Sequence, residues 1–407
     1  MKSLNATSNK SLNMYSNLQA KFKVLVEKAI DEFSSQDCQQ INLTSGQNSI
    51  TNWPEYNHVV SEIENYPEIT SHFNCYVGAN YFLVFSGPGY IQKFVLWCIR
   101  ESIKFDEDDF NKKFGSFVNF FNANTIEFTK ECNLYNFKST SNEINLNNEI
   151  IIRHIPIDDP KNLNENGYEV FSDFGFRMVQ RGQFKKLLIS RDDLSKDNFN
   201  CQSKEERIAV ENFDRVIEAI RVHKASACYR GHRVKTYYSG FCRILGESTN
   251  TDFYSRTSVG KKYEISEEEV EELKTIWEQL KNTDKLGLLS SKRLSYVSER
   301  RNIEDKLIDC FVGLESLYLP DGNAELTFRL SLRVAKMINE DGGSQKDLFK
   351  FIKNMYDKRS KVAHGRNVDV SQEEHSRLEN ILRLSVKRYI FDKSQFSEER
   401  LNDLLFI

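Results

Sequence analysis

The chain has 407 residues, 28% of them charged and 39% hydrophobic, which is enough for two or three soluble domains of ordinary size. It contains 18 glycines and 6 prolines, roughly half the usual share, which excludes collagen-like and Pro/Gly-rich disordered sequences. The 56 basic and 59 acidic side chains give a net charge of −3, so the overall charge indicates neither a nucleic-acid nor a membrane partner.

Targeting and metal-binding patterns are missing from the sequence. The first residues lack the apolar segment of a signal peptide, and the most apolar runs, at 81–85 and 94–99, are far too short to cross a membrane. The eight cysteines are scattered without the close pairs of a zinc finger or ribbon. We therefore expect a cytoplasmic protein with no membrane segment, no metal and no other cofactor.

The N-terminal part of the chain is patterned as helices. Residues 15–35 place apolar side chains at helical spacing, and residues 53–73 form a second such stretch. A short apolar run between 80 and 110 passes through a Ser-Gly-Pro-Gly turn into a third helix. These patterns predict a mainly helical region over 1–122.

Extended patterning begins at about residue 123. Strands rich in β-branched and aromatic residues are predicted over 125–137, 149–157 and 171–188. A helix is predicted over 206–222, and a strand pair or hairpin over 228–241. Residues 123–262 are therefore predicted to be a strand-rich α+β region.

Helix caps punctuate the last third of the chain. Ser266 and Glu269 form a capping box, and Ser344 and Ser371 each precede an acidic residue three positions later. Further helices are predicted over about 293–319 and 324–339. Because the connections are short, these helices are expected to pack as antiparallel neighbours. The predicted fold class is α+β, a mixed N-terminal region followed by an all-α bundle over 265–407.

One residue breaks the apolar pattern of the helix that follows Ser344. The apolar positions of its inner face are Leu348, Phe351 or Ile352, Met355 and Val362. Arg359 stands on this face where an apolar residue is expected. Because an unpaired buried charge is very costly, Arg359 must face a carboxylate, a cleft or a second subunit that uses its charge. His364 follows five residues later, next to the helix-stopping Gly365.

Two interpretations of Arg359 and His364 follow from this spacing. In the structural alternative, Arg359 pairs with Glu315 of the preceding helical segment, and His364 only ends its helix. In the functional interpretation, both side chains contact one phosphate, which requires the reach of arginine or unwinding near Gly365 because they lie about 140° apart on an ideal helix. A histidine and an arginine together supply proton transfer and a fork for phosphate oxygens.

The segment Arg359-Ser360-Lys361-Val362-Ala363-His364 resembles the Arg-x4-His signature of HEPN ribonucleases. Its surroundings are similar to the Apea-like branch of that family, over about residues 286–391. The matching segments, in order along the chain, are 304–309, 314–317, 325–330, 356–360 and 363–365. Ser360 stands where many members of the wider family carry Asn, Asp or His.

This resemblance implies a metal-independent endoribonuclease that acts as a homodimer or a higher even-numbered oligomer, with two Arg-x4-His motifs facing each other. His364 would exchange a proton with the RNA, and Arg359 would hold the scissile phosphate. Ser360, Lys361, Tyr356 and Glu315 are the candidate supporting or RNA-positioning residues. Proteins of this kind act in bacterial antiviral defence by abortive infection, so the region before residue 265 is expected to sense a phage-derived trigger or to regulate the nuclease.

Local charge supports an RNA partner. Residues 346–393 hold 12 Lys or Arg against 7 Asp or Glu, although a salt-bridged amphipathic surface would give the same count. A second basic stretch begins at 221–224 and continues through Arg230, Arg233 and Lys235, with tyrosines interleaved. Basic residues beside aromatic rings suit single-stranded RNA, and the solvated face of a hairpin explains them equally well.

Two rival functions stay open on the sequence alone. The bundle could be a non-catalytic dimerisation or RNA-binding module in which Arg359 and His364 are structural. It could also be a HEPN toxin controlled by a separate antitoxin. A basic cleft shared by two copies would favour catalysis, whereas Arg359 buried against Glu315 would favour the structural alternative.

Overall fold

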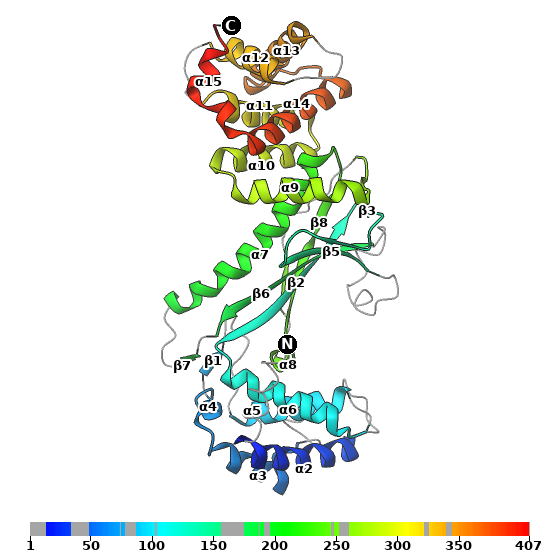
Figure 1. Ribbon diagram of the computed structural model, residues 1–407, viewed down its shortest axis with the longest axis vertical. Helices are drawn as coiled ribbons and strands as arrows, with labels where there is room; N and C mark the ends of the chain where they lie inside the picture. The colour runs from blue at the N-terminus through cyan, green and yellow to red at the C-terminus, as the bar shows by residue number, and fades with distance from the viewer. Residues whose placement is uncertain are drawn as a thin grey trace. The chain divides into compact units, whose positions relative to one another are not determined.

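The computed structural model of the chain confirms the α+β fold class (Figure 1). The structure describes residues 14–33, 49–73, 75–77, 87–101, 104–155, 175–186, 188–190, 196–245, 248–251, 260–320, 325–338 and 344–406. No described helix is both long enough and apolar enough to span a bilayer.

The chain divides into two compact units, each assembled from separate stretches of sequence. Unit 1 comprises Met1–Lys130, Arg181–Ile208 and Lys235–Thr249. Unit 2 comprises Glu131–Gln180, Ala209–Val234 and Asn250–Ile407. These units draw residues from both sides of the predicted limits at 122 and 262, and the three-part division 1–122, 123–262 and 265–407 stays a prediction.

The helices of unit 1 confirm the helical patterning of the N-terminal part. They are α2 (Ser16–Phe33), α3 (Pro54–Ile63), α4 (Pro67–Thr70), α5 (Gly87–Glu101) and α6 (Glu107–Asn122). The stretch predicted as one helix over 53–73 contains two, because Tyr66 precedes a proline and has extended backbone. The apolar run at 81–85 lies outside the described residues.

Aromatic side chains fill the core of unit 1. Phe22, Phe94 and Phe117 are fully buried and meet edge to face or tilted, with ring centroids about 5 Å apart. Phe241, from a distant stretch of the chain, packs edge to face on Phe117 at 4.9 Å. The backbone N–H of Phe241 donates to Ser116 Oγ at 2.9 Å, which fixes this stretch on α6. Residues far beyond 122 therefore complete the helical core.

The strands form one larger sheet and two small ones. The six-stranded sheet has the order β4-β5-β6-β2-β8-β9. Its strands are β2 (Thr125–Tyr135), β4 (Glu143–Asn145), β5 (Ile150–His154), β6 (Phe176–Lys185), β8 (Tyr229–Tyr238) and β9 (Ser248–Thr251). The three described strand predictions are confirmed, with β4, β5 and β6 antiparallel and in register through Ile144↔Ile152 and Ile152↔Met178. Residues 156–157, 171–174 and 187 lie outside the described residues.

The small sheets each pair two short strands. β1 (Cys75–Val77) is antiparallel to β7 (Leu188–Ser190), and β10 (Tyr263–Ile265) is parallel to β3 (Phe137–Ser139). The helix predicted over 206–222 is α7 (Lys196–His223), which begins ten residues earlier.

The strand pair predicted over 228–241 is wrong. This stretch is one continuous strand, β8, followed by the short helix α8 (Cys242–Leu245). A hairpin needs a turn residue with positive φ, and in this stretch Gly240 has it, at +58°, after the strand has ended. Gly231 stays extended inside the strand, where a Cβ atom would lie 3.2 Å from the Tyr135 ring.

The C-terminal helices belong to unit 2. After the 3₁₀ turn Glu267–Glu269 they are α9 (Val270–Asn282), α10 (Lys285–Glu299), α11 (Ile303–Tyr318), α12 (Leu326–Met337), α13 (Gln345–Ala363), α14 (Gln372–Phe391) and α15 (Glu398–Asp403). The capping boxes at Ser266 and Ser371 are both formed, and Ser344 Oγ accepts from Asp347 N–H at 3.1 Å. Among the described residues from 266 onwards there is no strand, as the sequence predicts.

The single helix predicted over 293–319 is wrong, because two helices occupy this stretch. Arg300 is extended and ends α10, and Asn302 begins α11 by accepting a hydrogen bond from the Glu304 N–H at 2.8 Å. The local cap outweighs the apolar periodicity that continues across it. α10 and α11 then pack side by side. On α11, Gly313 also allows close packing with α14, because an added Cβ atom there would lie 2.8 Å from Leu382.

Candidate functional site

The end of α13 brings the two motif residues to the surface of unit 2. His364 is the C-cap residue, and Gly365 follows with φ +71°. Gly365 N–H donates to the Val362 carbonyl at 2.8 Å, and Arg366 N–H donates to the Lys361 carbonyl at 2.9 Å. This pair of bonds is a Schellman motif, which the sequence signal of a glycine after the last helical turn predicts. The side chain of His364 is exposed.

Glu315 of α11 holds two side chains of α13. Its Oε1 accepts from Tyr356 Oη at 2.9 Å, and its Oε2 lies 3.5 Å from a terminal nitrogen of Arg359. The Arg359 guanidinium also stands over the Tyr356 ring, 5.6 Å from its centroid. Burial and the hydrogen bond to Glu315 raise the pKa of Tyr356 to about 12, so its hydroxyl stays a donor.

The ion pair that the structural alternative predicts is therefore present, but its N–O distance is long and both side chains are partly exposed. The side chains of Arg359 and Glu315 are each 25% exposed, so Arg359 is not buried against the carboxylate. The Nε of Arg359 is covered and has no hydrogen-bond partner. A guanidinium has five N–H donors, and among the described residues Glu315 is their one hydrogen-bond acceptor.

Lys358 and Glu374 fix the loop that carries His364. The carboxylate of Glu374 accepts from Lys358 Nζ at 2.7 and 2.8 Å and from the Ser371 N–H at 2.9 Å. One side chain thus joins the last turns of α13 to the start of α14. The hydrogen bond from Lys358 and the backbone bond from Ser371 hold the pKa of Glu374 below its usual value. In the sequence, the capping box at Ser371 is the one signal that points to this pair.

The remaining predicted supporting residues lie on the same helical end. Ser360 is half-buried, and Lys361 is exposed. Neither forms an ion pair or side-chain hydrogen bond within the described residues. Arg366, just beyond the Schellman motif, is exposed too. The structure therefore brings Glu315, Tyr356 and Arg359 into contact and leaves Lys361 and His364 open to solvent.

The prediction that Arg230 contacts RNA is wrong. Its side chain is 1% exposed, and its Nε and a terminal nitrogen reach the two carboxylate oxygens of Asp214 at 2.6 and 3.4 Å. Arg233 and Lys235 are half-exposed on β8. Arg221, at the start of the same basic stretch, is also buried and donates to the carbonyls of Ser295 and Cys228 at 3.0 Å. Two of the arginines in this stretch, Arg221 and Arg230, are therefore used for internal ion pairs.

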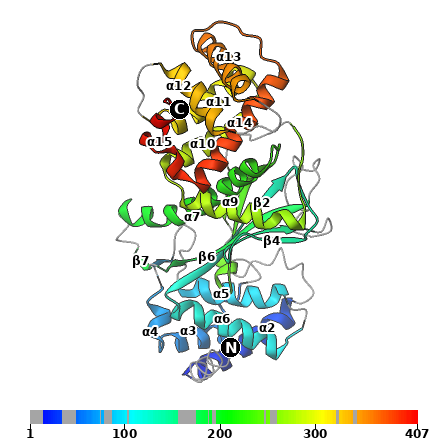
Figure 2. The same ribbon diagram turned by 45° about the horizontal axis from the view of Figure 1, so that its top comes forward.

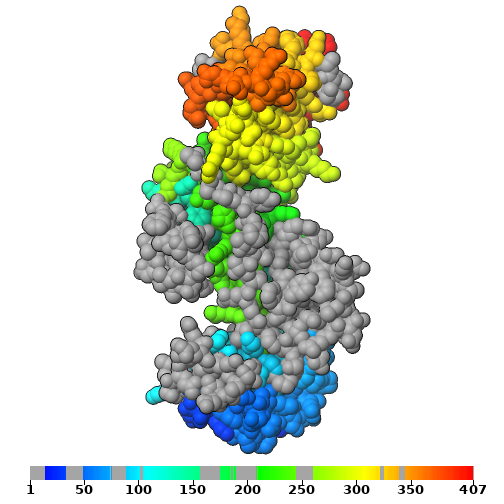
Figure 3. Space-filling model, turned by 180° about the vertical axis from the view of Figure 1, so that it is seen from behind, coloured from blue at the N-terminus to red at the C-terminus, as the bar shows by residue number. Residues whose placement is uncertain are grey.

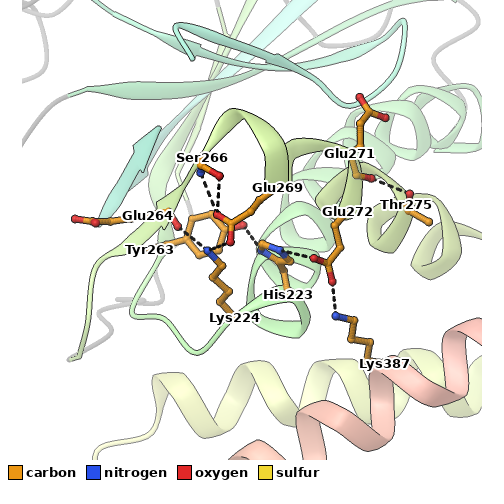
Figure 4. Close-up of polar contacts among 10 residues, drawn as sticks. All are labelled: His223, Lys224, Tyr263, Glu264, Ser266, Glu269, Glu271, Glu272, Thr275 and Lys387. Atoms are coloured by element: carbon orange, nitrogen blue, oxygen red, sulfur yellow. Dashed lines mark hydrogen bonds and ion pairs between the residues drawn. The ribbon is translucent and has the colours of Figure 1, made fainter. Parts of the chain in front are cut away.

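A second polar cluster joins α7, β10, α9 and α14 (Figure 4). Tyr263 Oη lies 2.7 Å from His223 Nδ1, and His223 Nε2 lies 3.4 Å from Glu272, which also pairs with Lys387. Burial lowers the pKa of His223 and raises that of Tyr263. Because the His223 side chain is 2% exposed, a substrate cannot reach the Tyr–His pair, and we assign it to the core.

Beside it, Lys224 pairs with Glu269 and donates to the Glu264 carbonyl at 3.2 Å (Figure 4). The bonds from Lys224 and from the Ser266 backbone hold the pKa of Glu269 at about 2. The predicted capping box therefore also anchors the end of α7.

Within the described residues, no group of three or more His, Cys, Asp or Glu is placed to hold a metal ion. Comparison with known proteins finds no matching family model, no matching curated protein and no matching solved structure.

Proposed function

We propose that the protein is a cytoplasmic, metal-independent endoribonuclease of the HEPN type, with Arg359 and His364 as its catalytic residues. The observation that carries this proposal is the state of Arg359. Its guanidinium is oriented by Glu315 and Tyr356, has no other hydrogen-bond partner among the described residues, and lies on the same helical end as an exposed histidine. The segments that resemble Apea-like HEPN proteins also fall on α11, α12 and α13 in the required order.

The two side chains match the chemistry of RNA cleavage by an internal 2′-OH. In that reaction the 2′-oxygen attacks the adjacent phosphorus, the bond to the 5′-oxygen breaks, and a 2′,3′-cyclic phosphate and a 5′-hydroxyl result. His364 would accept the 2′-OH proton or donate one to the leaving oxygen. Arg359 would bind the non-bridging phosphate oxygens and stabilise the charge that develops on them.

Glu315 acts as the positioning partner of Arg359 in this proposal. Its contact with Arg359 is 3.5 Å long, whereas its bond from Tyr356 is 2.9 Å. A phosphate can therefore take the free donors of Arg359 while Glu315 keeps its bond to Tyr356. The oriented guanidinium loses less side-chain entropy on binding than a free one would.

From the resemblance we further propose a composite site in a homodimer and a role in bacterial antiviral defence. The region before residue 265 would then sense a phage-derived trigger or regulate the nuclease. These parts of the proposal rest on the resemblance.

The test is cleavage of total tRNA and of a structured RNA by the full-length protein in EDTA. We expect wild type to release fragments with 2′,3′-cyclic phosphate ends, and Arg359→Ala and His364→Ala each to lower the rate by at least about 100-fold. Lys281→Ala, an exposed change on α9, is the control for protein handling. Cleavage that survives both substitutions in folded protein would overturn the proposal.

The Arg359–Glu315 pair also favours a second candidate, a non-catalytic HEPN module that dimerises or binds RNA. In that case Arg359→Ala lowers the unfolding temperature, RNA stays intact, and Glu315→Gln gives the same loss of stability. A toxin held by an antitoxin is a third reading, which predicts a stoichiometric second protein in preparations from the native host.

A further inference from the structure

The exposed face of α13 carries a row of lysines that we call the lysine stripe. It consists of Lys346, Lys350, Lys353 and Lys361, all of them exposed. At 100° per residue their positions fall within about 80° of the helix circumference, opposite the buried residues of α13. Those buried residues are Leu348, Ile352, Met355 and Tyr356. The stripe runs along about 22 Å of helix.

No lysine of the stripe has an ion-pair partner among the described residues. Other basic residues of the 346–393 segment do: Lys358 pairs with Glu374, Arg359 with Glu315, Arg383 with Glu379, Lys387 with Glu272 and Lys393 with Asp284. The positive charge of this segment is therefore concentrated on one face of α13. Asp357 is the single acidic residue in the row.

The stripe leads to His364 at the end of α13. At 100° per residue His364 falls within the arc of the stripe, whereas Arg359 lies on the inner face of α13, about 160° from Lys361. Arg366 extends the exposed positive charge past the helix end. α13 lies at the edge of the bundle beside α12 (Figures 1 and 2). From behind, the atoms of residues 345–391, in orange, form part of the surface of the bundle (Figure 3).

The composition of this face distinguishes between anionic partners. None of the large exposed hydrophobic residues of the described chain lies on α13. Protein interfaces are built around an apolar core, whereas the backbone of a nucleic acid is bound by charge alone. Isolated lysines act as point charges for phosphates and carry no base specificity. The face therefore fits an RNA backbone better than an acidic protein.

We propose that the lysine stripe of α13 is a binding track for the phosphate backbone of the RNA, which it leads to His364 at the end of the helix. This inference rests on the proposed ribonuclease function and names the surface that holds its substrate. Binding along the stripe would be largely independent of RNA sequence and strongly dependent on salt.

The test is binding of a fluorescein-labelled 20-nucleotide single-stranded RNA, measured by anisotropy in EDTA at several salt concentrations. Full-length protein with His364→Ala is used so that the RNA stays intact. We expect the triple variant Lys346→Gln, Lys350→Gln, Lys353→Gln to bind about tenfold more weakly near 0.1 M salt. The slope of log affinity against log salt should fall by about 2, because each lost contact with a single strand removes about 0.7. Lys361 is kept, since it adjoins the proposed site.

A matched control removes three other exposed lysines of unit 2. Lys281→Gln, Lys285→Gln, Lys292→Gln makes the same change in net charge on α9 and α10. It should bind RNA within about twofold of the parent. Asp357→Asn changes the net charge in the opposite direction and should tighten RNA binding about twofold, because it removes the acidic residue from the stripe.

The outcomes separate this inference from the proposed function. Equal weakening by the stripe variant and the control, or no RNA binding at all, overturns the stripe even if the wild type cleaves RNA. RNA binding that depends on the stripe, in a wild type that cleaves nothing, supports the stripe and overturns the ribonuclease. The same assay is repeated with labelled polyglutamate in place of RNA. A stripe variant that loses polyglutamate binding but keeps RNA binding would overturn the RNA track in favour of an acidic protein partner.

Discussion

Two segments of the chain are basic in sequence, and the structure uses them in different ways. In β8, Arg230 points inward and pairs with Asp214, so only Arg233 and Lys235 are half-exposed. In α13, the lysines share one outer face and have no ion-pair partners among the described residues. A charge count therefore indicates an anionic partner only when the charges are unpaired and lie on one exposed face.

The geometry of the two elements explains this difference. Successive side chains of a strand point to opposite faces, so Arg230 and Arg233 cannot both face solvent on a sheet with one covered side. A helix repeats its faces every three to four residues, which keeps lysines at 346, 350 and 353 on one side.

The largest expected effect tests the buried ion pair of β8. Arg230→Ala removes a guanidinium that is 1% exposed from its pair with Asp214, which is 28% exposed, and should lower the free energy of unfolding by about 3 kcal/mol. Urea denaturation followed by circular dichroism measures this loss. Arg233→Ala, three residues along the same strand and half-exposed, should change it by less than about 0.5 kcal/mol.

A combined replacement sharpens this result. Arg230→Met with Asp214→Leu should recover most of the loss, because neither charge is then left unpaired. Equal, small effects of Arg230→Ala and Arg233→Ala would contradict the view that β8 uses its charge internally.

A buried carboxylate that forms no ion pair among the described residues predicts a pH dependence. Glu218 of α7 is 5% exposed and accepts a hydrogen bond from Ser291 Oγ at 2.9 Å. Burial raises its pKa to about 7, and the bond from Ser291 and the charges of Arg215 and Lys292 act in the opposite direction. The folded state therefore binds this proton more tightly than the unfolded state does.

Glu218→Gln should remove this pH dependence. A raised folded pKa gives stability that is complete below about pH 4.5 and is lost as the pH rises to about 7. Above pH 7 the variant should be more stable than wild type by up to about 3 kcal/mol, and near pH 4 the two should agree. Urea denaturation at a series of pH values measures this; Glu271→Gln, 79% exposed, should show no such divergence.

The smallest expected effect concerns the helix end that presents His364. At Gly365, with φ +71°, an added Cβ would meet nothing within 4 Å, so Gly365→Ala should cost about 1 kcal/mol through backbone conformation alone. Gly115 lies inside α6 with equal space and no positive φ, so Gly115→Ala should stabilise by about 0.5–1 kcal/mol. Thermal unfolding should show opposite shifts; equal signs would mean that Gly365 does not set the end of α13.

Local signals in the sequence were sufficient for much of the helical part. The capping boxes at Ser266 and Ser371, the cap at Ser344 and the stop at Gly365 are formed as predicted, because each involves residues only a few positions apart. The contact between Arg359 and Glu315 was foreseen as an alternative, since the sequence places an arginine on a buried stripe. The predictions of a hairpin over 228–241 and of a single helix over 293–319 were wrong. Pairing with neighbouring strands keeps the first stretch extended, and a local helix cap divides the second.

The sequence by itself determined the α+β class, most element types and the basic character of two segments. Tertiary structure alone decided which basic residues meet a carboxylate: Asp214 with Arg230, Glu374 with Lys358 and Glu272 with Lys387. The partners in these pairs lie 16 to 115 positions apart in the sequence, so no local spacing predicts them. Charge pairing depends on distances of a few ångströms between elements brought together by the packing of the core, and that packing is what decided where the unpaired positive charge of this protein lies.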